Sequence, residues 1–307
     1  MDIYLAACFT NQYMRGQKRY EKLTEYEQSI VHKIPNILES FHYVGAQKYV
    51  DDMRREGAKI FLDSGAFSAY TLGVALDLPG YCQYIQRNMD IIRVEDGTVM
   101  ASVLDGIGDP LQTWHNQLWM ESLGVRPLPC FHAGEDERYL EHYVRNYDYI
   151  TLGGMVGTSN KQLMVWLDRI FDKYICDGSG RPRCKVHGFG ITARDVMMRY
   201  PWYSVDSSSW IQAAAFGFII TPEWRNITVS DKSPLRHEAG AHAMTLTEVE
   251  QQVVLESLEN AGFTLERLST VYESRAAYNM WSFGVINAMI NADGNREHFQ
   301  LHNQELF

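Results

Sequence analysis

Short apolar runs rich in β-branched and aromatic residues recur along the chain, and each is followed by a longer mixed segment. This alternation predicts strands that are each followed by a helix, which is typical of a parallel sheet built from βα units. The number of runs predicts a (β/α)8 barrel of the α/β class. The expected strands are Ile3–Phe9, Lys59–Leu62, Thr98–Leu104, Arg126–Phe131, Tyr149–Leu152, Lys185–Phe189, Trp202–Val205 and Phe216–Ile220.

The pattern changes after Thr221. Residues 221–242 are polar and rich in turn formers, as in an active-site loop or a subunit contact. Residues 245–248 read as a capping box, so a helix is expected to begin there and to stop at Gly262. A second helix is expected near Leu265–Asn291. We therefore expect one barrel domain over residues 1–307, in which 221–307 form a loop and a C-terminal helical extension.

Composition places the chain among ordinary globular proteins, with 46% hydrophobic and 21% charged residues among 307. No apolar run approaches the roughly 20 residues of a membrane helix, and the N-terminus lacks a signal-peptide pattern. A cytoplasmic protein without a membrane partner is expected. The five cysteines are scattered, and neither a C-x2-C pair nor an H-E-x-x-H frame occurs. The sequence therefore predicts neither a metal nor a cofactor.

The formal net charge of −10 argues against a general nucleic-acid coat, because such affinity comes from neutralising phosphates. The charged residues are distributed unevenly along the chain. Residues 160–199 hold eight basic and four acidic side chains, and a second basic group lies near the N-terminus. Solvated faces explain most such groups, with phosphate binding as the alternative. The candidates for gripping phosphates are Lys161, Arg181, Arg183, Lys185, Arg194, Arg15, Lys18 and Arg19.

Three apolar runs end in an aspartate beside small residues, namely Asp63, Asp105 and Asp206. Aspartate is depleted in strands, and a (β/α)8 barrel carries its chemistry at the C-terminal strand ends. The three carboxylates are therefore expected to converge in one pocket, although each could instead cap the following turn. Glycine pairs follow two other strands, and they lack the spacing of a dinucleotide fingerprint or a phosphate loop.

Six short motifs, in order, resemble those of the tRNA-guanine transglycosylase superfamily over about half the chain, Asp63–Ser208. Asp63-Ser64-Gly65-Ala66-Phe67 is similar to the family's D-S-G-G-[FY], and Val205-Asp206-Ser207 to its F-D-C nucleophile site. The other four segments are Leu104-Asp105-Gly106, Cys130-Phe131-His132-Ala133-Gly134, Leu152-Gly153-Gly154 and His187-Gly188-Phe189-Gly190-Ile191-Thr192.

The resemblance implies a role for each matching position. Asp206 would be the nucleophile at the sugar's anomeric carbon, and Asp63 the general acid and base for the departing and incoming bases. The remaining positions would bind the base: Asp105, His132, Gly153 and Gly154 at its edge, Phe67 and His187 on its faces, and Ser64 beside Asp63. An Asp–sugar intermediate needs no external energy source and no cofactor.

Two departures from the family bear on the substrate. His132 stands where the family has a glutamine that helps to read the base, and the cysteine-rich zinc site of the tRNA enzymes has no counterpart. The chain therefore looks most like the 7-deazaguanine DNA transglycosylases of bacteriophages, acting in the host cytoplasm if phage-encoded. These exchange guanine in DNA for a free 7-deazaguanine base such as 7-cyano-7-deazaguanine (preQ0).

Other interpretations remain open at this point. The same motifs fit an enzyme acting on tRNA. A non-catalytic nucleic-acid or nucleobase-binding protein, or a sugar hydrolase using Asp63 and Asp206, would also retain the paired acids. Barrel enzymes of this kind often form homodimers, and the sequence does not fix the oligomeric state.

Overall fold

The computed structural model describes residues 1–155, 157–222, 226–292 and 298–299. The chain divides into two compact units, each assembled from separated segments. The sheet unit consists of Met1–Thr10, Asn36–Ser207 and Ile290–Phe307, and the helical unit of Asn11–Pro35 and Ser208–Met289. Residues 221–289 thus belong to a unit that also contains an N-terminal segment.

A curled parallel sheet forms the centre of the sheet unit. Among the described residues it has seven strands in the order β3-β2-β1-β9-β8-β7-β6. Every neighbouring pair is parallel, so all C-terminal strand ends lie at the same edge. The strands are β1 (Asp2–Ala6), β2 (Ile37–Ser40), β3 (Ile60–Asp63), β6 (Cys130–His132), β7 (Tyr149–Gly153), β8 (Lys185–Gly188) and β9 (Ser204–Ser207).

An irregular segment at residues 100–103 extends the parallel pattern. Ala101 forms a parallel bridge with Leu62 of β3, and Ser102 forms one with Leu128, which precedes β6. Its backbone also exchanges hydrogen bonds of 2.8–2.9 Å with both neighbours. A short antiparallel hairpin, β4 (Val94–Glu95) and β5 (Thr98–Val99), leads into it. The α/β architecture expected from the sequence is therefore present as a curled parallel sheet with helices.

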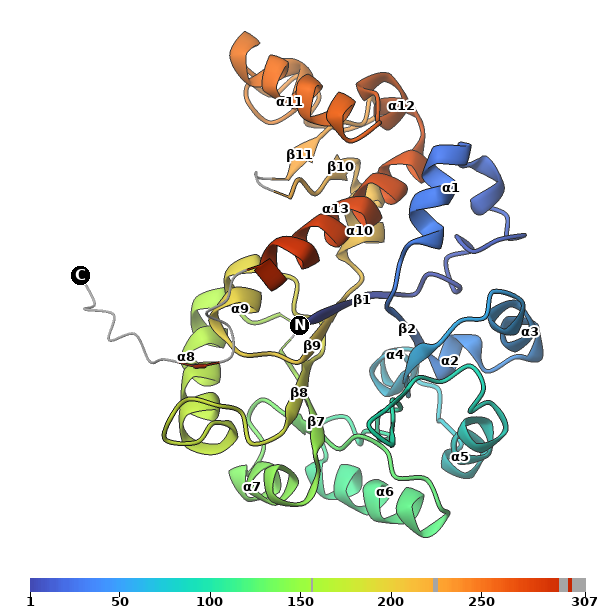
Figure 1. The fold of residues 1–307 in the computed structure, drawn as a ribbon, viewed down its shortest axis with the longest axis vertical. Helices are drawn as coiled ribbons and strands as arrows, with labels where there is room; N and C mark the ends of the chain where they lie inside the picture. The colour runs from blue at the N-terminus through green and yellow to red at the C-terminus, as the bar shows by residue number, and fades with distance from the viewer. Residues whose placement is uncertain (156, 223–225, 293–297, 300–307) are drawn as a thin grey trace. The chain divides into compact units, whose positions relative to one another are not determined.

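Helices follow most of the strands and lie around the outside of the sheet (Figure 1). The amphipathic ones bury one face; in α7, for example, Leu140 and Tyr143 are buried while Arg138 and Arg145 are exposed. The helical elements of this unit are α2 (Phe41–Val44), α3 (Gln47–Arg55), α4 (Ala66–Thr71), α5 (Leu78–Arg87), α6 (Pro110–Ser122), α7 (Glu137–Asn146), α8 (Asn160–Ile170), the π-helical η2 (Phe171–Ile175) and α9 (Arg194–Arg199).

Alternate residues of the strands pack together on one face of the curled sheet. Tyr4, Leu38, Phe61 and Tyr149 belong to one buried cluster. Side chains alternate between faces, so Ser40 and Asp63, each two residues beyond a cluster member, share this inner face. Asp206 joins them because it pairs in register with Tyr4. The apolar layer thus forms a floor beneath the polar strand ends.

The helical unit has its own hydrophobic core and its own ion pairs. Glu27, buried on α1, accepts hydrogen bonds of 2.8 and 2.7 Å from Arg267 of α12 and one of 2.5 Å from Ser274 of α13. These join segments far apart in the sequence. The elements are η1 (Tyr20–Lys22), α1 (Glu25–His32), α10 (Ser209–Phe216), β10 (Phe218–Ile219), β11 (Ile227–Thr228), η3 (Ala243–Thr245), α11 (Glu248–Asn260), α12 (Leu265–Thr270) and α13 (Tyr272–Ala292), whose last three residues cluster with the sheet unit.

Several element predictions were wrong in detail. The run at 216–220 is no barrel strand: β10 pairs antiparallel with β11 in a separate two-stranded sheet. Strand β2 was missed because Ile37 and Leu38 are its only apolar residues. The capping box lies at Thr247 and Glu250 rather than 245–248, and Val271 divides the expected second helix into α12 and α13.

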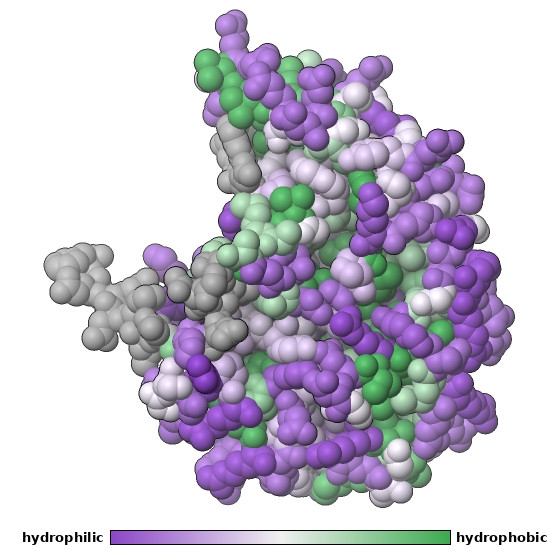
Figure 2. Space-filling model, in the orientation of Figure 1, coloured by the Kyte–Doolittle hydropathy of each residue, from purple (hydrophilic) through white to green (hydrophobic). Residues whose placement is uncertain are grey.

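Polar side chains cover most of the face shown in Figure 2, and apolar side chains gather there in smaller groups. None of the helices within the described ranges combines the length and the apolarity needed to cross a bilayer.

Candidate active site

The inner face of the sheet ends in a layer of polar side chains. Asp63 pairs in register with Ser40, and His132 pairs with Gly153. His187 pairs with Ser204, two residues before Asp206. Parallel strands thus bring together residues as far apart in the sequence as Ser40 and Asp206, at the end where enzymes with parallel α/β sheets place their chemistry.

Asp63 is held by three donors. Ser40 Oγ donates to Oδ2 at 2.7 Å, the Gly65 backbone N–H donates to the same oxygen at 2.9 Å, and Ser102 Oγ lies 3.3 Å from Oδ1. Burial nevertheless raises the pKa of Asp63 to about 6, and the nearby charges of Asp105 and Asp206 act in the same direction. A carboxyl with such a pKa can both give and take a proton near neutral pH.

Asp206 is a buried carboxylate whose side chain is 11% exposed. His187 Nε2 lies 3.3 Å from Oδ1, and the Gly190 backbone N–H donates to the same oxygen at 2.9 Å. Both contacts go to Oδ1, and none of the hydrogen bonds found within the described residues goes to Oδ2. Asp206 is therefore oriented through one oxygen, which leaves the other for a reacting atom.

His187 is fixed by a chain of hydroxyl groups. Its Nδ1 lies 2.6 Å from Ser204 Oγ, which in turn lies 2.6 Å from the Tyr149 hydroxyl. Burial lowers the pKa of His187, and the hydrogen bond to Asp206 opposes this shift. The consistent assignment is a neutral imidazole that accepts from Ser204 at Nδ1 and donates from Nε2 to Asp206.

His187 does not lie exposed as a stacking surface. It is fully buried, and its ring centre lies 4.6 Å from that of Phe61 and 4.8 Å from that of Phe189. Its position fits the orientation of Asp206 better than the expected role on a base face.

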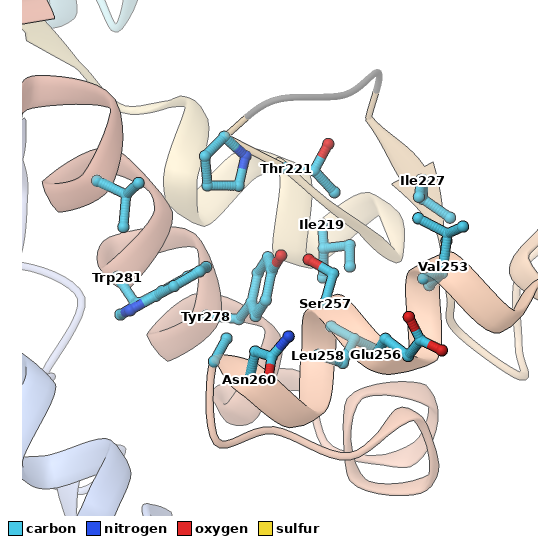
Figure 3. Close-up of a pocket in the computed structure, with 14 residues that line it drawn as sticks. Ile219, Thr221, Ile227, Val253, Glu256, Ser257, Leu258, Asn260, Tyr278 and Trp281 are labelled. Atoms are coloured by element: carbon cyan, nitrogen blue, oxygen red, sulfur yellow. The ribbon is translucent and has the colours of Figure 1, made fainter. Parts of the chain in front are cut away.

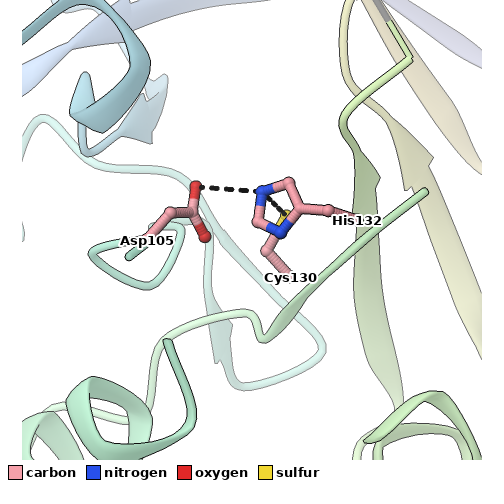
Figure 4. Close-up of side chains that lie close together, drawn as sticks. All are labelled: Asp105, Cys130 and His132. Carbon is pink, nitrogen blue, oxygen red and sulfur yellow. Dashed lines mark hydrogen bonds and ion pairs between the residues drawn. The ribbon is translucent and has the colours of Figure 1, made fainter. Parts of the chain in front are cut away.

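A second polar group lies at the ends of β6 and the preceding strand-like segment. His132 Nε2 lies 3.7 Å from Asp105 Oδ2 and 3.5 Å from Cys130 Sγ, while Nδ1 lies 2.9 Å from Glu135 Oε1. Figure 4 shows one imidazole nitrogen joined by dashed lines to the Asp105 carboxylate and to the Cys130 sulfur. The neighbouring negative groups raise the pKa of His132, because they favour the imidazolium.

Gly153 and Gly154 provide room beside His132. A Cβ on Gly153 would lie 2.9 Å from His132 Cδ2, and one on Gly154, which has φ +69°, would lie 3.1 Å from the Ala133 nitrogen. These two glycines therefore allow the ring of His132 to pack against β7. Ser64 is fully buried; its N–H donates to Ser102 Oγ at 3.0 Å, which links it to the surroundings of Asp63.

Phe67 lies at the surface, four residues after Asp63 in the sequence. It is 62% exposed on the first turn of α4, and the nearby Tyr70, Leu72 and Val74 are 67%, 62% and 49% exposed. A group of exposed apolar side chains next to polar strand ends is a feature of ligand-contacting surfaces. The expected stacking role of Phe67 is compatible with this exposure.

The structure separates the predicted basic residues. Lys161 and Arg194 lie at the starts of α8 and α9, after strand ends of the polar layer. Arg181 and Arg183 precede β8 and Lys185 begins it, so all three lie at the opposite end; Lys185 also pairs with Asp96 at 2.6 Å. Arg15, Lys18 and Arg19 belong to the helical unit, where Arg19 packs 5.2 Å from the ring centre of Tyr272.

Several site residues escaped the sequence-based prediction. Ser40 lies on the unrecognised β2, and Ser102, Ser204 and Glu135 carry no motif of their own. The spacing of Cys130 and His132 does indicate that their side chains lie together, because residues two apart in a strand point to the same face.

Glu39 was also missed by the sequence-based prediction. It is fully buried and accepts hydrogen bonds from Phe9 N at 2.6 Å and Thr10 Oγ1 at 2.7 Å, which fixes the segment after β1.

A separate pocket of about 420 Å³ lies within the helical unit, between α11, α13 and the β10–β11 sheet (Figure 3). Its described lining is mainly apolar, with Val253, Tyr278 and Trp281 prominent and Glu256 as its carboxylate. It lacks the convergent titratable groups of the polar layer, so the sheet unit holds the better candidate for catalysis.

No protein-family model matches the chain, and a search of curated proteins finds no match for it.

Proposed function

We propose that this protein is a nucleobase-exchanging glycosyltransferase of the tRNA-guanine transglycosylase superfamily. It would replace guanine in DNA with a 7-deazaguanine base such as preQ0 through a covalent Asp206–sugar intermediate. The observation that carries the proposal is the placement of Asp63 and Asp206 in one polar layer, close enough for the charge of Asp206 to raise the pKa of Asp63. The motif resemblance supplies the substrate class.

The fold is compatible with this family. In the proposal, the segment at residues 100–103 serves as the eighth strand, because it bridges β3 on one side and Leu128 on the other. The seven strands and this segment would form the closed (β/α)8 barrel of a transglycosylase. Its polar strand ends would be the base pocket.

In the first half-reaction, Asp206 Oδ2 attacks the anomeric carbon C1′ of the target nucleotide. The glycosidic C–N bond breaks as the C1′–O bond forms, and Asp63 in its protonated form gives its proton to the departing guanine. His187 and the Gly190 N–H hold Oδ1, so that Oδ2 is presented to the sugar. Such oriented donors act without reorganisation during the reaction.

In the second half-reaction, the incoming base replaces guanine. Asp63, now ionised, removes a proton from the base nitrogen that attacks C1′, and Asp206 departs as a carboxylate. Proton count and bond count are restored, which agrees with exchange that needs no energy source. A pKa of about 6 lets Asp63 serve in both directions.

Access to C1′ requires that the target nucleotide leave the base stack. The exposed Phe67, on the helix α4 that follows Asp63 and β3, offers a surface on which a flipped or neighbouring base could stack. Lys161 and Arg194, at the same end of the strands, are the predicted basic residues suited to the flanking phosphates. Arg181, Arg183 and Lys185 are not included in this contact.

The test is incubation of the full chain with DNA and radiolabelled guanine or preQ0, with RNA in a parallel arm. We expect label in DNA, and denaturing electrophoresis should reveal a protein–DNA adduct that Asp206→Asn abolishes. Asp195→Asn, an exposed carboxylate on α9, is the matched control and should retain activity. Label in tRNA alone would transfer the proposal to the RNA branch, and an adduct that persists in Asp206→Asn would refute the assigned nucleophile.

A further inference from the structure

We propose that Asp105, Cys130 and His132 form a binding site for one divalent transition-metal ion, with zinc favoured by the ligand chemistry. One oxygen, one sulfur and one nitrogen donor from these side chains all lie within 4.8 Å of one another. Thiolate, imidazole and carboxylate are the three ligand types that zinc takes in proteins.

Two of the three separations between the donor atoms match those expected around a single tetrahedral ion. Zinc binds sulfur at about 2.3 Å, nitrogen at about 2.05 Å and oxygen at about 2.1 Å, so tetrahedral angles place sulfur and nitrogen about 3.5 Å apart and nitrogen and oxygen about 3.4 Å apart. The observed separations are 3.5 Å from Cys130 Sγ to His132 Nε2 and 3.7 Å from His132 Nε2 to Asp105 Oδ2. The third separation, from Cys130 Sγ to the Asp105 carboxylate, lies within 4.8 Å, and tetrahedral zinc needs about 3.6 Å there, so closure around an ion requires a shift of at most about 1 Å.

Glu135 holds His132 in the orientation that a ligand requires. Its Oε1 lies 2.9 Å from His132 Nδ1, and its Oε2 accepts the His132 backbone N–H at 3.0 Å. With the Nδ1 proton engaged by a carboxylate, Nε2 faces Asp105 and Cys130 (Figure 4), and a bound metal ion would take the place of the Nε2 proton. A carboxylate–histidine–metal arrangement of this kind is the usual second layer of zinc sites.

Asp105 supplies an independent indication. Its side chain is 10% exposed, and its Oδ1 is buried without a hydrogen-bond partner among the described residues. An unpaired buried carboxylate oxygen is costly, and a cation satisfies it. Cys130 is 1% exposed, so the sulfur is also shielded from bulk water. The cluster thus lacks a partner at Asp105 Oδ1, which an ion held by both oxygens of this carboxylate would supply.

The site would add an element to the polar layer that the proposed exchange reaction does not require. Three protein ligands leave the fourth position of zinc for water or a substrate atom. A base edge at this position would meet the ion, whereas the family resemblance implies direct contact with Asp105 and His132. Metal binding is measured without DNA or base, so its outcome is independent of the proposed function.

The experiment measures zinc in the purified full chain by mass spectrometry after dialysis, and then replaces it with Co²⁺. We expect about one zinc per chain, together with the near-ultraviolet thiolate-to-cobalt band and the visible bands of tetrahedral cobalt. Cys130→Ser should remove the thiolate band. Cys184→Ser, which changes another buried cysteine, should leave the spectrum unchanged.

Glu135→Gln keeps all three ligands and provides a test that does not depend on removing one. It should weaken Zn²⁺ binding about 10- to 100-fold, the usual effect of losing a partner of a ligating histidine. The proposal is overturned if the wild-type chain binds no stoichiometric zinc and gives no thiolate–cobalt band. An unchanged band in Cys130→Ser would overturn it equally.

Discussion

Relative to the wild type, the variant Asp63→Asn should gain stability as the pH rises from acidic to neutral. Burial and the charges of Asp105 and Asp206 hold the pKa of Asp63 at about 6, whereas its ordinary value is 3.8. The folded protein therefore binds this proton more tightly than the unfolded chain does. Ionised Asp63 is consequently a destabilising group in the folded state.

The magnitude follows from the difference in pKa. A shift of about 2 pKa units corresponds to about 3 kcal/mol, which we take as an upper limit. Below pH 3.8 the carboxyl is protonated in both states and costs nothing. As the pH rises from about 4 to about 6, ionisation of Asp63 lowers the free energy of unfolding of the wild type, whereas Asp63→Asn has no such ionisation. The variant's relative free energy of unfolding should therefore rise by up to about 3 kcal/mol across that interval.

Chemical denaturation of both proteins at several values of pH between 4 and 8 measures this difference. Any constant cost of the amide cancels when the values are compared across pH. Asp90→Asn is the control: its partner Arg54 lowers the pKa of Asp90 below the ordinary 3.8, so this carboxyl is ionised in both the folded and the unfolded state across most of the interval. The stability difference between Asp90→Asn and the wild type should therefore change little from pH 4 to pH 8. A stability difference between Asp63→Asn and wild type that stays the same from pH 4 to pH 8 would refute the reasoning.

Three further predictions concern separate contacts. Gly65→Ala should lower the free energy of unfolding by more than about 2 kcal/mol in chemical denaturation, because φ is +76° and the new Cβ would lie 2.5 Å from His42 Cβ. Gly73→Ala, with φ +66° and open space around the new Cβ, should lower it by about 1 kcal/mol. Equal losses in the two variants would contradict the steric argument. Asp168→Asn should cost about 1–3 kcal/mol, because Asp168 accepts 2.8 and 2.7 Å hydrogen bonds from Arg199; a loss below about 0.5 kcal/mol would show that the pair contributes little. Phe67→Ala should change stability by less than about 0.5 kcal/mol while weakening single-stranded DNA binding by about 1–3 kcal/mol; equal weakening by Leu72→Ala would argue against base stacking.

The sequence predicted the α/β class because buried parallel strands such as Tyr149–Leu152 are mainly apolar runs. Such runs can be identified without knowing which strands they pair with. It failed where tertiary context decides. In β2, buried Glu39 interrupts the apolar pattern, and the hydrogen bonds that compensate for its burial come from Phe9 and Thr10, about 30 residues away. Conversely, residues 216–220 are apolar enough for a central strand, but they pair with β11 instead.

The candidate site was predictable in its acids and not in their partners. Aspartates that end apolar runs drew attention to Asp63, Asp105 and Asp206 directly. Ser40 and Ser102 are common residues without local signals, and only strand register brings them to Asp63. The basic residues show the same limit: proximity in sequence grouped Lys161 with Lys185, and the direction of β8 separates them.

The interleaved arrangement of the two units has a consequence for biosynthesis. Residues 11–35 emerge early from the ribosome, yet Glu27 meets Arg267 and Ser274 only after some 240 further residues have been translated. Until then its carboxylate lacks these native partners, and the helical unit cannot complete its core. A ribosome that stalls after Ser207 would therefore release a chain with all seven strands of the parallel sheet and an orphaned α1, a natural target for chaperones or proteases.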